Sequence, residues 1–315
     1  MDGQGVGSDH CMPAILDAAE KAGVKVAIHV RSQHNSASTD SAAPRHCPSV
    51  HSHVHLTVLP LVQLEPYPLR SEYSVKDDLE YIFQQYGNHP AFYRHPSTNQ
   101  CLVYAYDSYH MTPHQWQQLL TADGSMTIRG TEHDCIFIAL VLDNVDEAVH
   151  SGFDGVYSYF AATGFTRAAD TSQWKQYVKQ AAEHGMLFVP SVAPGYDDTR
   201  LRPWNGHNKR DRQHGAYYDA MWQAAIDSGA SIVAVTTYNE WGEGTQIEPA
   251  RPFVTSKGDR LAGYSEDAVG GQAGEVLSDG EEYLYVERTA QWMERWRETA
   301  AAGAGDGSKR HQELR

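Results

Sequence analysis

The segment "SIVAVTTYNEWGEGTQIEP" (residues 231–249) joins a strand-like run to a cluster of carboxylates. Its first part is apolar and β-branched, which is typical of a strand buried on both faces in a parallel sheet. Glu240, Glu243 and Glu248 follow at once, beside Trp241. A buried strand that ends in carboxylates and an indole indicates a functional edge of a sheet.

The rest of the chain alternates similar runs with helical patterns. The further strand-like runs are residues 24–30, 101–107, 135–143, 154–160 and 186–194. Helical patterns, several with a Ser or Thr cap and a terminal Gly, cover residues 12–23, 74–87, 112–120, 171–185 and 214–229, and a last one follows at 281–302. Strands and helices that alternate over short connections predict an α/β fold with a parallel sheet, either open or closed into a barrel.

Polar side chains at the predicted strand ends favour the barrel. Asp107 and Tyr109 follow one strand, and Tyr196, Asp197 and Asp198 follow another. Catalytic groups of a (β/α)₈ TIM barrel gather in this way at the C-terminal face of the strands. A doubly wound sheet would more often carry a G-x-G-x-x-G turn, which this sequence lacks.

Composition and charge exclude several functions. The formal net charge of −15 leaves no basic stripe for nucleic acid. No uncharged apolar run approaches the length of a membrane span, and the first residues have neither the basic nor the apolar region of a targeting signal. The sequence therefore predicts neither a nucleic-acid partner nor a membrane span.

The four cysteines do not indicate a metal or redox site, because no two have C-x-x-C spacing. Two disulfides remain arithmetically possible. Cys101 and Cys135 each begin an apolar run, and we expect them to be small buried side chains. No metal site and no cofactor is predicted.

The carboxylates after residue 238 admit two interpretations. Glutamates often belong to a charged, solvated loop. Glycosidic bond cleavage, however, needs one acid to protonate the leaving oxygen and a second carboxylate to assist attack. The position directly after an apolar strand and next to Trp241 favours the catalytic interpretation.

Several blocks of the sequence resemble, in matching order, the endo-α-mannosidase family, glycoside hydrolase family 99. The blocks are "EPYPLRS" (65–71), "YGNHPAFYR" (86–94), "YAYDSY" (104–109), "SGFDGVYSYFA" (151–161), "PSVAPGYDDTRLRPWN" (190–205) and "NEWGEGTQIE" (239–248). The resemblance implies a retaining endo-glycosidase on a (β/α)₈ barrel that cleaves internal α-1,2-mannosidic linkages of high-mannose N-glycans or mannans.

The resemblance also implies an unusual mechanism, in which the substrate's own 2-hydroxyl replaces the carboxylate nucleophile. Glu240 would deprotonate this hydroxyl, which closes an anhydro sugar. Glu243 would act first as the acid and then as the base that activates water. This mechanism needs no metal.

Further sugar-binding residues carry over from the matched blocks. They are Glu65, Tyr67, Tyr106, Tyr109, Tyr159, Arg202, Trp204, Asn239 and Trp241. Arg202 would donate two parallel hydrogen bonds to a sugar or a catalytic carboxylate, or it would tie down the loop at Asp197 and Asp198. Tyr104 and Tyr157 alternate with Tyr106 and Tyr159 along their strands, so one member of each pair points away from the barrel interior.

The chain departs from the family at position 242, over residues 30–63 and at its start, where the family's first two strands are not found. Family sequences often read "NEWHEG", whereas position 242 is Gly. Residues 30–63 are expected to be an irregular insertion, because joining His29 to Leu64 gives an uninterrupted strand with its glutamate. Within it, His51, His53 and His55 allow a metal cluster, but a compositionally biased loop is the favoured interpretation.

These departures lead to one predicted domain, an incomplete TIM barrel over residues 1–300 that lacks its first two strands, with a disordered tail at 301–315. The partner is a mannose-rich oligosaccharide, and the protein is expected to be a monomer. A Golgi or secretory location is implied by the resemblance alone. Two alternatives stay open: an impaired remnant that only binds glycans, and a retaining glycosidase with a carboxylate nucleophile.

Overall fold

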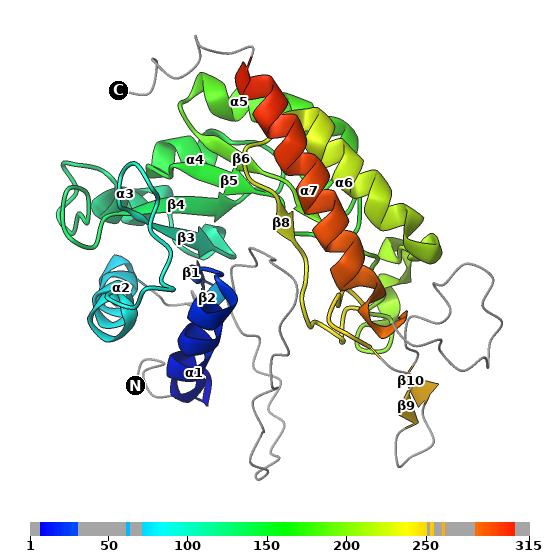
Figure 1. The fold of residues 1–315 in the computed structure, drawn as a ribbon. Helices are drawn as coiled ribbons and strands as arrows, with labels where there is room; N and C mark the ends of the chain where they lie inside the picture. Colours follow the sequence, from blue (N-terminus) through cyan, green and yellow to red (C-terminus); the bar gives the residue numbers. More distant parts are fainter. Residues whose placement is uncertain are drawn as a thin grey trace. The chain divides into compact units, whose positions relative to one another are not determined.

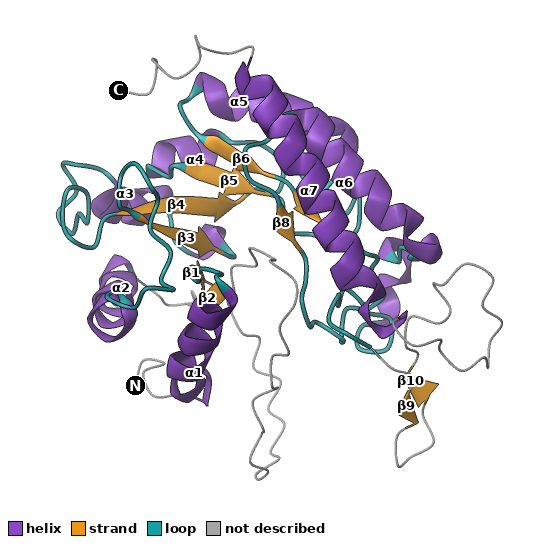
Figure 2. Ribbon diagram, viewed as in Figure 1, coloured by secondary structure: helices purple, strands orange, loops and turns teal. Residues whose placement is uncertain are grey.

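The computed structural model describes residues 7–30, 61–63, 71–250, 253–254, 260–261 and 281–305. The chain divides into two compact units, and each is considered by itself. The first unit comprises Met1–Leu140 and Asp146–Val156, and the second comprises Val141–Val145 and Tyr157–Arg315. Both contain helices and strands (Figures 1 and 2).

The first unit contains a parallel sheet. Its strands are β1 (Ala27–Val30), β2 (Leu61–Gln63), β3 (Cys101–Ala105) and β4 (Cys135–Leu140). They lie in the order β2-β1-β3-β4, and each neighbouring pair is parallel. Every residue of β3 is buried, as the continuous apolar pattern predicts for a strand covered on both faces. The predicted α/β class with a parallel sheet is confirmed.

Strand β2 corrects the predicted extent of the irregular insertion. Leu61–Gln63 belong to the stretch predicted to be irregular, yet they pair in register with Ala27, Ile28 and His29 of β1. Val30 is likewise part of β1. The polar, His-rich composition of the whole stretch masked a short apolar segment that can join a sheet edge. The rest of the predicted insertion, with its three clustered histidines, lies outside the described residues.

The described residues of the first unit include four α-helices. They are α1 (Gly7–Ala22), α2 (Glu72–Tyr86), α3 (Pro113–Leu120) and α4 (Asp146–Ser151). Helix α3 begins as predicted, with Thr112 in a capping box with Gln115 and Pro113 at the first turn. Helix α2 begins earlier than predicted, because Ser71 caps it and Ser74 completes the capping box.

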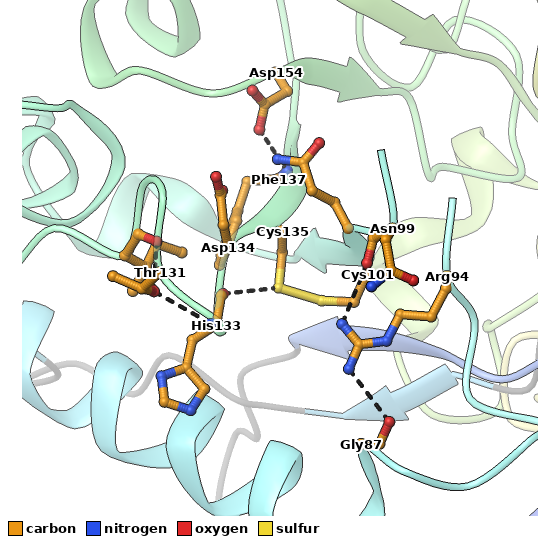
Figure 3. The surroundings of a disulfide bond; sticks show 12 residues. Gly87, Arg94, Asn99, Cys101, Thr131, His133, Asp134, Cys135, Phe137 and Asp154 are labelled. Atoms are coloured by element: carbon orange, nitrogen blue, oxygen red, sulfur yellow. Dashed lines mark hydrogen bonds between the residues drawn. A yellow bond between two sulfur atoms is a disulfide. The ribbon is translucent and has the colours of Figure 1, made fainter. Parts of the chain in front are cut away.

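The core of the first unit includes a cluster of aromatic rings, and a half-buried ion pair joins the segments before β4 and β5. The Trp116 ring lies 4.8 Å from Phe153 and 6.5 Å from Phe137. Arg129 Nη2 lies 2.9 Å from Asp154 Oδ2, which also accepts a 2.8 Å hydrogen bond from the Phe137 amide (Figure 3). Desolvation raises the pKa of Asp154 even though Arg129 opposes the shift. This pairing fixes the chain that leads into β4.

Cys101 and Cys135 form a disulfide bond between the first residues of β3 and β4 (Figure 3). The two residues are register partners in the parallel ladder, and their Cα atoms are 4.6 Å apart. Both are buried, as predicted. The expectation of two separate small side chains is wrong, because it took no account of the register that places the cysteines opposite each other.

The described strands of the second unit are short, with two or three residues each. Strand β5 (Gly155–Tyr157) leads into it, followed by β6 (Leu187–Val189), β7 (Ser191–Val192) and β8 (Ala234–Val235). Strands β7 and β8 are parallel, whereas β9 (Phe253–Val254) and β10 (Arg260–Leu261) are antiparallel. The strand predicted over 231–239 is thus confined to β8, whose two residues are only half-buried.

The helices of the second unit are α5 (Trp174–Glu183), α6 (Ala216–Ser228) and α7 (Leu284–Gly305). Helices α6 and α7 lie side by side (Figure 1). Arg288 of α7 donates to both carboxylate oxygens of Asp219 on α6, at 2.7 and 2.6 Å, and Trp292 adds a 2.7 Å bond to the same group. Helix α7 includes the first residues of the predicted tail, and the rest of the tail lies outside the described residues. Among the described helices, none is both long and apolar enough to cross a membrane.

Candidate active site

The predicted catalytic glutamates lie on one closed loop after β8, residues 237–248, called here the glutamate loop. The Glu240 amide donates to Thr237 Oγ1 at 3.0 Å, and the Thr245 amide returns a 3.2 Å bond to the Glu240 carbonyl. The Thr237 amide also donates to the Thr245 carbonyl at 3.0 Å. These bonds fix the backbone at both ends of the segment that carries Glu240 and Glu243.

Glu240 is half-buried, and its carboxylate is held by the loop itself. Its Oε1 accepts a 3.1 Å hydrogen bond from the Gly242 amide. A Cβ atom at position 242 would lie 3.0 Å from this oxygen and 2.8 Å from Cδ1 of Leu201. Glycine therefore permits the close approach of the carboxylate to the backbone, where family sequences often carry His.

Glu243 faces Arg202. Its side chain is 15% exposed, and its Oε1 lies 3.4 Å from Arg202 Nη1. The same nitrogen donates a 2.9 Å hydrogen bond to Asp198 Oδ2. Arg202 thus shares one nitrogen between two carboxylates, those of Asp198 and Glu243. Among its contacts with the described residues, the expected pair of parallel bonds to a single carboxylate is not found.

Asp198 is the centre of the network beside Glu243. It is 1% exposed, and Asn205 Nδ2 donates to both of its oxygens, at 3.1 and 3.0 Å. Burial opposes ionisation, but the hydrogen bonds from Arg202, Asn205 and Tyr196 outweigh it and lower the pKa of Asp198. The hydrogen bond that Arg202 donates to Asp198 in turn raises the pKa of Arg202. Both groups are therefore charged near neutral pH.

Tyr196 completes this network as a neutral phenol. Burial raises its pKa first, and the negative charges of Glu243 and Asp198 raise it further. Its hydroxyl accepts a 3.1 Å bond from Asn205 Nδ2. The position of Tyr196 and Asp198 after a strand was a sequence signal for a functional role. Asn205 was not singled out, although it lies in the block that supplied Arg202 and Trp204.

Four further predicted residues lie in the second unit. Tyr159 has a positive φ of 48°, which is uncommon for a residue with a side chain, and its carbonyl accepts a 2.7 Å bond from Thr236 Oγ1. The Trp241 indole donates to the Glu248 carboxylate. Asn239 is exposed on the glutamate loop. Trp204, on the 3₁₀ helix η3 (Pro203–Asn208), is 77% exposed.

The remaining predicted residues belong to the first unit. Tyr109 is exposed and donates a 2.6 Å hydrogen bond to Asp107, which itself has a φ of 51°. Tyr106 is half-buried and follows the last residue of β3, whereas Tyr104, two residues earlier, is buried. Residues two apart on a strand point to the same face, so this difference reflects the end of the strand and not the expected alternation. Glu65 and Tyr67 lie outside the described residues.

A hollow of about 940 Å³ is present in the first unit, and its described lining includes neither Tyr106 nor Tyr109. Arg94 lines it, with its guanidinium 4.8 Å from the centre of the Phe83 ring, and donates to the Gly87 and Asn99 carbonyls (Figure 3). These contacts satisfy Arg94 within the protein. Within the described part of the chain, no group of three or more His, Cys, Asp or Glu side chains could hold a metal ion.

Comparisons with known proteins identify the family of this chain. A sequence profile of glycosyl hydrolase family 99 matches residues 51–298. The chain is 39% identical over 259 residues to a glycoprotein endo-alpha-1,2-mannosidase-like protein of Danio rerio, covering 81% of this chain and 51% of that protein. It is 34% identical over 303 residues to a glycoprotein endo-alpha-1,2-mannosidase of Rattus norvegicus, covering 94% and 54%. The chain thus spans about half the length of these relatives.

The structure is also similar to a solved enzyme, the GH99 endo-alpha-mannosidase of Bacteroides thetaiotaomicron in complex with bis-tris-propane. The TM-score is 0.76 at 36% identity, and the match covers 96% of this chain and 79% of that one. A profile match over most of the sequence and structural similarity at this identity point to the same family. The chain belongs to glycosyl hydrolase family 99.

Proposed function

We propose that this chain is a retaining endo-glycosidase that cleaves internal α-1,2-mannosidic linkages of mannose-rich glycans. The observation that carries the proposal is the glutamate loop, which presents two half-buried carboxylates in different surroundings. Glu240 accepts a backbone hydrogen bond, whereas Glu243 faces a shared guanidinium. Different surroundings allow two carboxylates to divide the work of base and acid.

The proposed reaction proceeds in two steps through the substrate's own 2-hydroxyl. In the first step the Glu240 carboxylate takes the proton of this hydroxyl, whose oxygen attacks C1. Glu243 gives its proton to the glycosidic oxygen as the C1–O bond breaks, which leaves a 1,2-anhydro sugar. In the second step Glu243 takes a proton from water, whose oxygen attacks C1, and Glu240 returns its proton to O2. Two inversions at C1 retain the α configuration.

We propose that the parallel strands form part of a (β/α)₈ barrel and that residues 1–300 act as one domain. The similarity to the Bacteroides enzyme supports the barrel. Within the second unit, site residues that follow β7 and β8 fit a site at the C-terminal ends of barrel strands. On this proposal Tyr106 and Tyr109, like Tyr159 and Trp241, contact sugar hydroxyls and ring faces.

The function is tested by incubating the purified chain with an α-1,2-linked mannan oligosaccharide and, separately, with a glucosylated high-mannose glycan. We expect release of a disaccharide, seen by mass spectrometry, with the α-anomer formed first in the ¹H NMR spectrum. In H₂¹⁸O the new reducing end gains one ¹⁸O atom. A preference between the two substrates tells whether mannose or glucose precedes the cleaved bond.

Three outcomes contradict the proposal. A folded chain, judged by circular dichroism, that binds the glycan without cleaving it is the impaired remnant. Release of single mannose residues indicates an exo-acting enzyme. A glutamate covalently labelled by a fluorosugar indicates a carboxylate nucleophile in place of the 2-hydroxyl.

Gly242→Ala is expected to lower kcat/KM roughly three- to tenfold, because small displacements of a catalytic group are costly. The added Cβ would lie 3.0 Å from Glu240 Oε1 and 2.8 Å from Leu201 Cδ1. Leu201 is 57% exposed and can turn away, but the carboxylate would lose its place on the loop. Kinetics of Leu201→Ala and of the double variant separate the two contacts. Full recovery in the double variant would identify Leu201 as the obstacle and contradict the role given to Glu240.

We also propose a Golgi or other secretory location. The Cys101–Cys135 disulfide supports it, because disulfides form and persist in oxidising compartments. Microscopy of the tagged chain with a Golgi marker tests this proposal, and a uniform cytosolic signal would contradict it.

A further inference from the structure

We propose that Asp198 is a positioning residue, which holds Arg202 beside Glu243 and offsets the positive charge that Arg202 brings there. Asp198 is 1% exposed and bonds Arg202 Nη1 at 2.9 Å. That nitrogen lies 3.4 Å from Glu243 Oε1. Asp198 therefore acts on the reacting carboxyl through the guanidinium between them.

The need for an offsetting charge follows from the role of Glu243. A general acid has to hold its proton at the working pH, but a neighbouring guanidinium favours the ionised carboxylate. A second carboxylate on the same guanidinium nitrogen opposes that effect. Arg202 can then orient Glu243 by a hydrogen bond without removing its proton. The part of this inference that makes Glu243 the acid rests on the proposed function. The charge coupling between Asp198, Arg202 and Glu243 does not depend on it.

The anchoring of Asp198 makes this arrangement rigid. Asn205 Nδ2 donates to both carboxylate oxygens, at 3.1 and 3.0 Å. The Arg202 and Leu201 amides donate to the Asp198 carbonyl at 2.7 and 2.8 Å. Because main chain and side chain are both held, Asp198 sets the position of Arg202, whose own side chain is 44% exposed.

Other ionisable groups of the second unit also lie near Glu243. Tyr196 is neutral, because burial and then the charges of Glu243 and Asp198 raise its pKa. The Asp197 amide donates to the Glu243 carbonyl at 2.8 Å, and the Asp197 carboxylate pairs with Lys209 at 3.1 Å.

Two more carboxylates belong to these surroundings. Lys209 also pairs with Asp211 at 3.5 Å. Glu240 lies on the same loop as Glu243, with its Oε1 on the Gly242 amide. None of these groups is itself replaced in the Asp198 and Arg202 variants, so all the proteins compared contain them.

The test compares Asp198→Asn, Arg202→Gln and the double variant in the whole chain. The titration of Glu243 is followed by ¹³C NMR with glutamate labelled at Cδ, and Glu243→Gln assigns its signal. We expect Asp198→Asn to lower the pKa of Glu243 by roughly one unit and Arg202→Gln to raise it by a similar amount. The double variant should titrate near the wild type.

The pH dependence of activity is expected to shift in the same directions as the pKa of Glu243. The alkaline limb of kcat/KM against pH should move to lower pH in Asp198→Asn and to higher pH in Arg202→Gln, because this limb reports the acid in the free enzyme. Opposite signs distinguish charge coupling from a structural role, which would only lower the rate. Asp143→Asn is the matched control: it removes the same charge from an ion pair with Arg167 at 3.5 Å, where Asp143 is 70% exposed.

Two results would overturn the inference: an unchanged titration of Glu243 in Asp198→Asn, or shifts of the same sign in both variants. If the chain does not turn over glycan, the proposed function fails and the NMR titration still decides the coupling. If Asp198→Asn does not fold, Arg202→Gln decides alone, and an unchanged or lowered pKa of Glu243 in that variant overturns the inference.

Discussion

Glu243→Gln is expected to lower kcat on a mannan oligosaccharide by about 10³- to 10⁴-fold, towards the upper end of what general acid–base catalysis contributes. The loss is large because Glu243 serves both steps, as acid for the leaving oxygen and as base for water. A glutamine in its place keeps the size of the side chain and can still accept a hydrogen bond from Arg202, so the chain should remain folded. Steady-state kinetics measure the loss.

The choice of leaving group in the substrate distinguishes the acid role of Glu243 from the base role of Glu240. On an aryl glycoside whose phenol leaves without protonation, the first step of Glu243→Gln should recover most of its rate, visible as a burst of phenol. Glu240→Gln should stay slow on both substrates, because attack by the 2-hydroxyl still lacks its base. Equal losses for the two variants on the aryl substrate would contradict this division of roles.

Glu248→Gln is the matched control on the same loop. The substitution is identical, and an amide oxygen can still accept the hydrogen bond of the Trp241 indole. We expect kcat to stay within about threefold of the wild type. A loss as large as that of Glu243→Gln would mean that the whole loop, and not one carboxyl, is being disturbed.

The sequence predicted the features that depend on local pattern. The Thr112 cap and Pro113 determine where α3 begins, because both act within one helical turn. The apolar run from Cys101 predicted the buried strand β3 for a similar reason. The order of the matched blocks predicted the family.

Features that depend on distant partners could not be predicted. The disulfide requires the register between β3 and β4, and no local pattern specifies which residue of β4 faces Cys101. The shared contact of Arg202 requires the path of the chain from Asp198 to Glu243. Strand β8 pairs with β7 over only two residues, and no local pattern specifies the extent of this pairing.

Loss of the Cys101–Cys135 disulfide is expected to destabilise the first unit by about 2–4 kcal/mol. The bond closes a segment with a sequence separation of 34, which contains α3. Without it the unfolded chain gains conformational freedom, and this gain grows with the logarithm of the segment length. The folded sheet keeps its ladder of hydrogen bonds, so the effect is on stability rather than on the fold.

Reduction of the wild type tests this most cleanly, because it removes only the bond between the sulfurs and leaves the side chains in the core. A Cys101→Ala/Cys135→Ala variant also loses buried atoms and should be slightly less stable than the reduced wild type. The variant is at the same time the control for the reductant, to which it should not respond. A response of equal size in the variant would show that the reductant acts elsewhere.

Hydrogen exchange followed by mass spectrometry is the suitable measurement, because a chain of two compact units does not give a single unfolding free energy. Peptides from β3 and β4 should exchange faster after reduction, by the factor of roughly 30 to 1,000 that 2–4 kcal/mol represents. Peptides from α6 and α7, which the Arg288–Asp219 contact holds together in the second unit, should not change. Both cysteines are buried, so reduction itself should be slow and should proceed through opening of the first unit. Rapid reduction without faster exchange in β3 and β4 would mean that the bond does not hold this sheet.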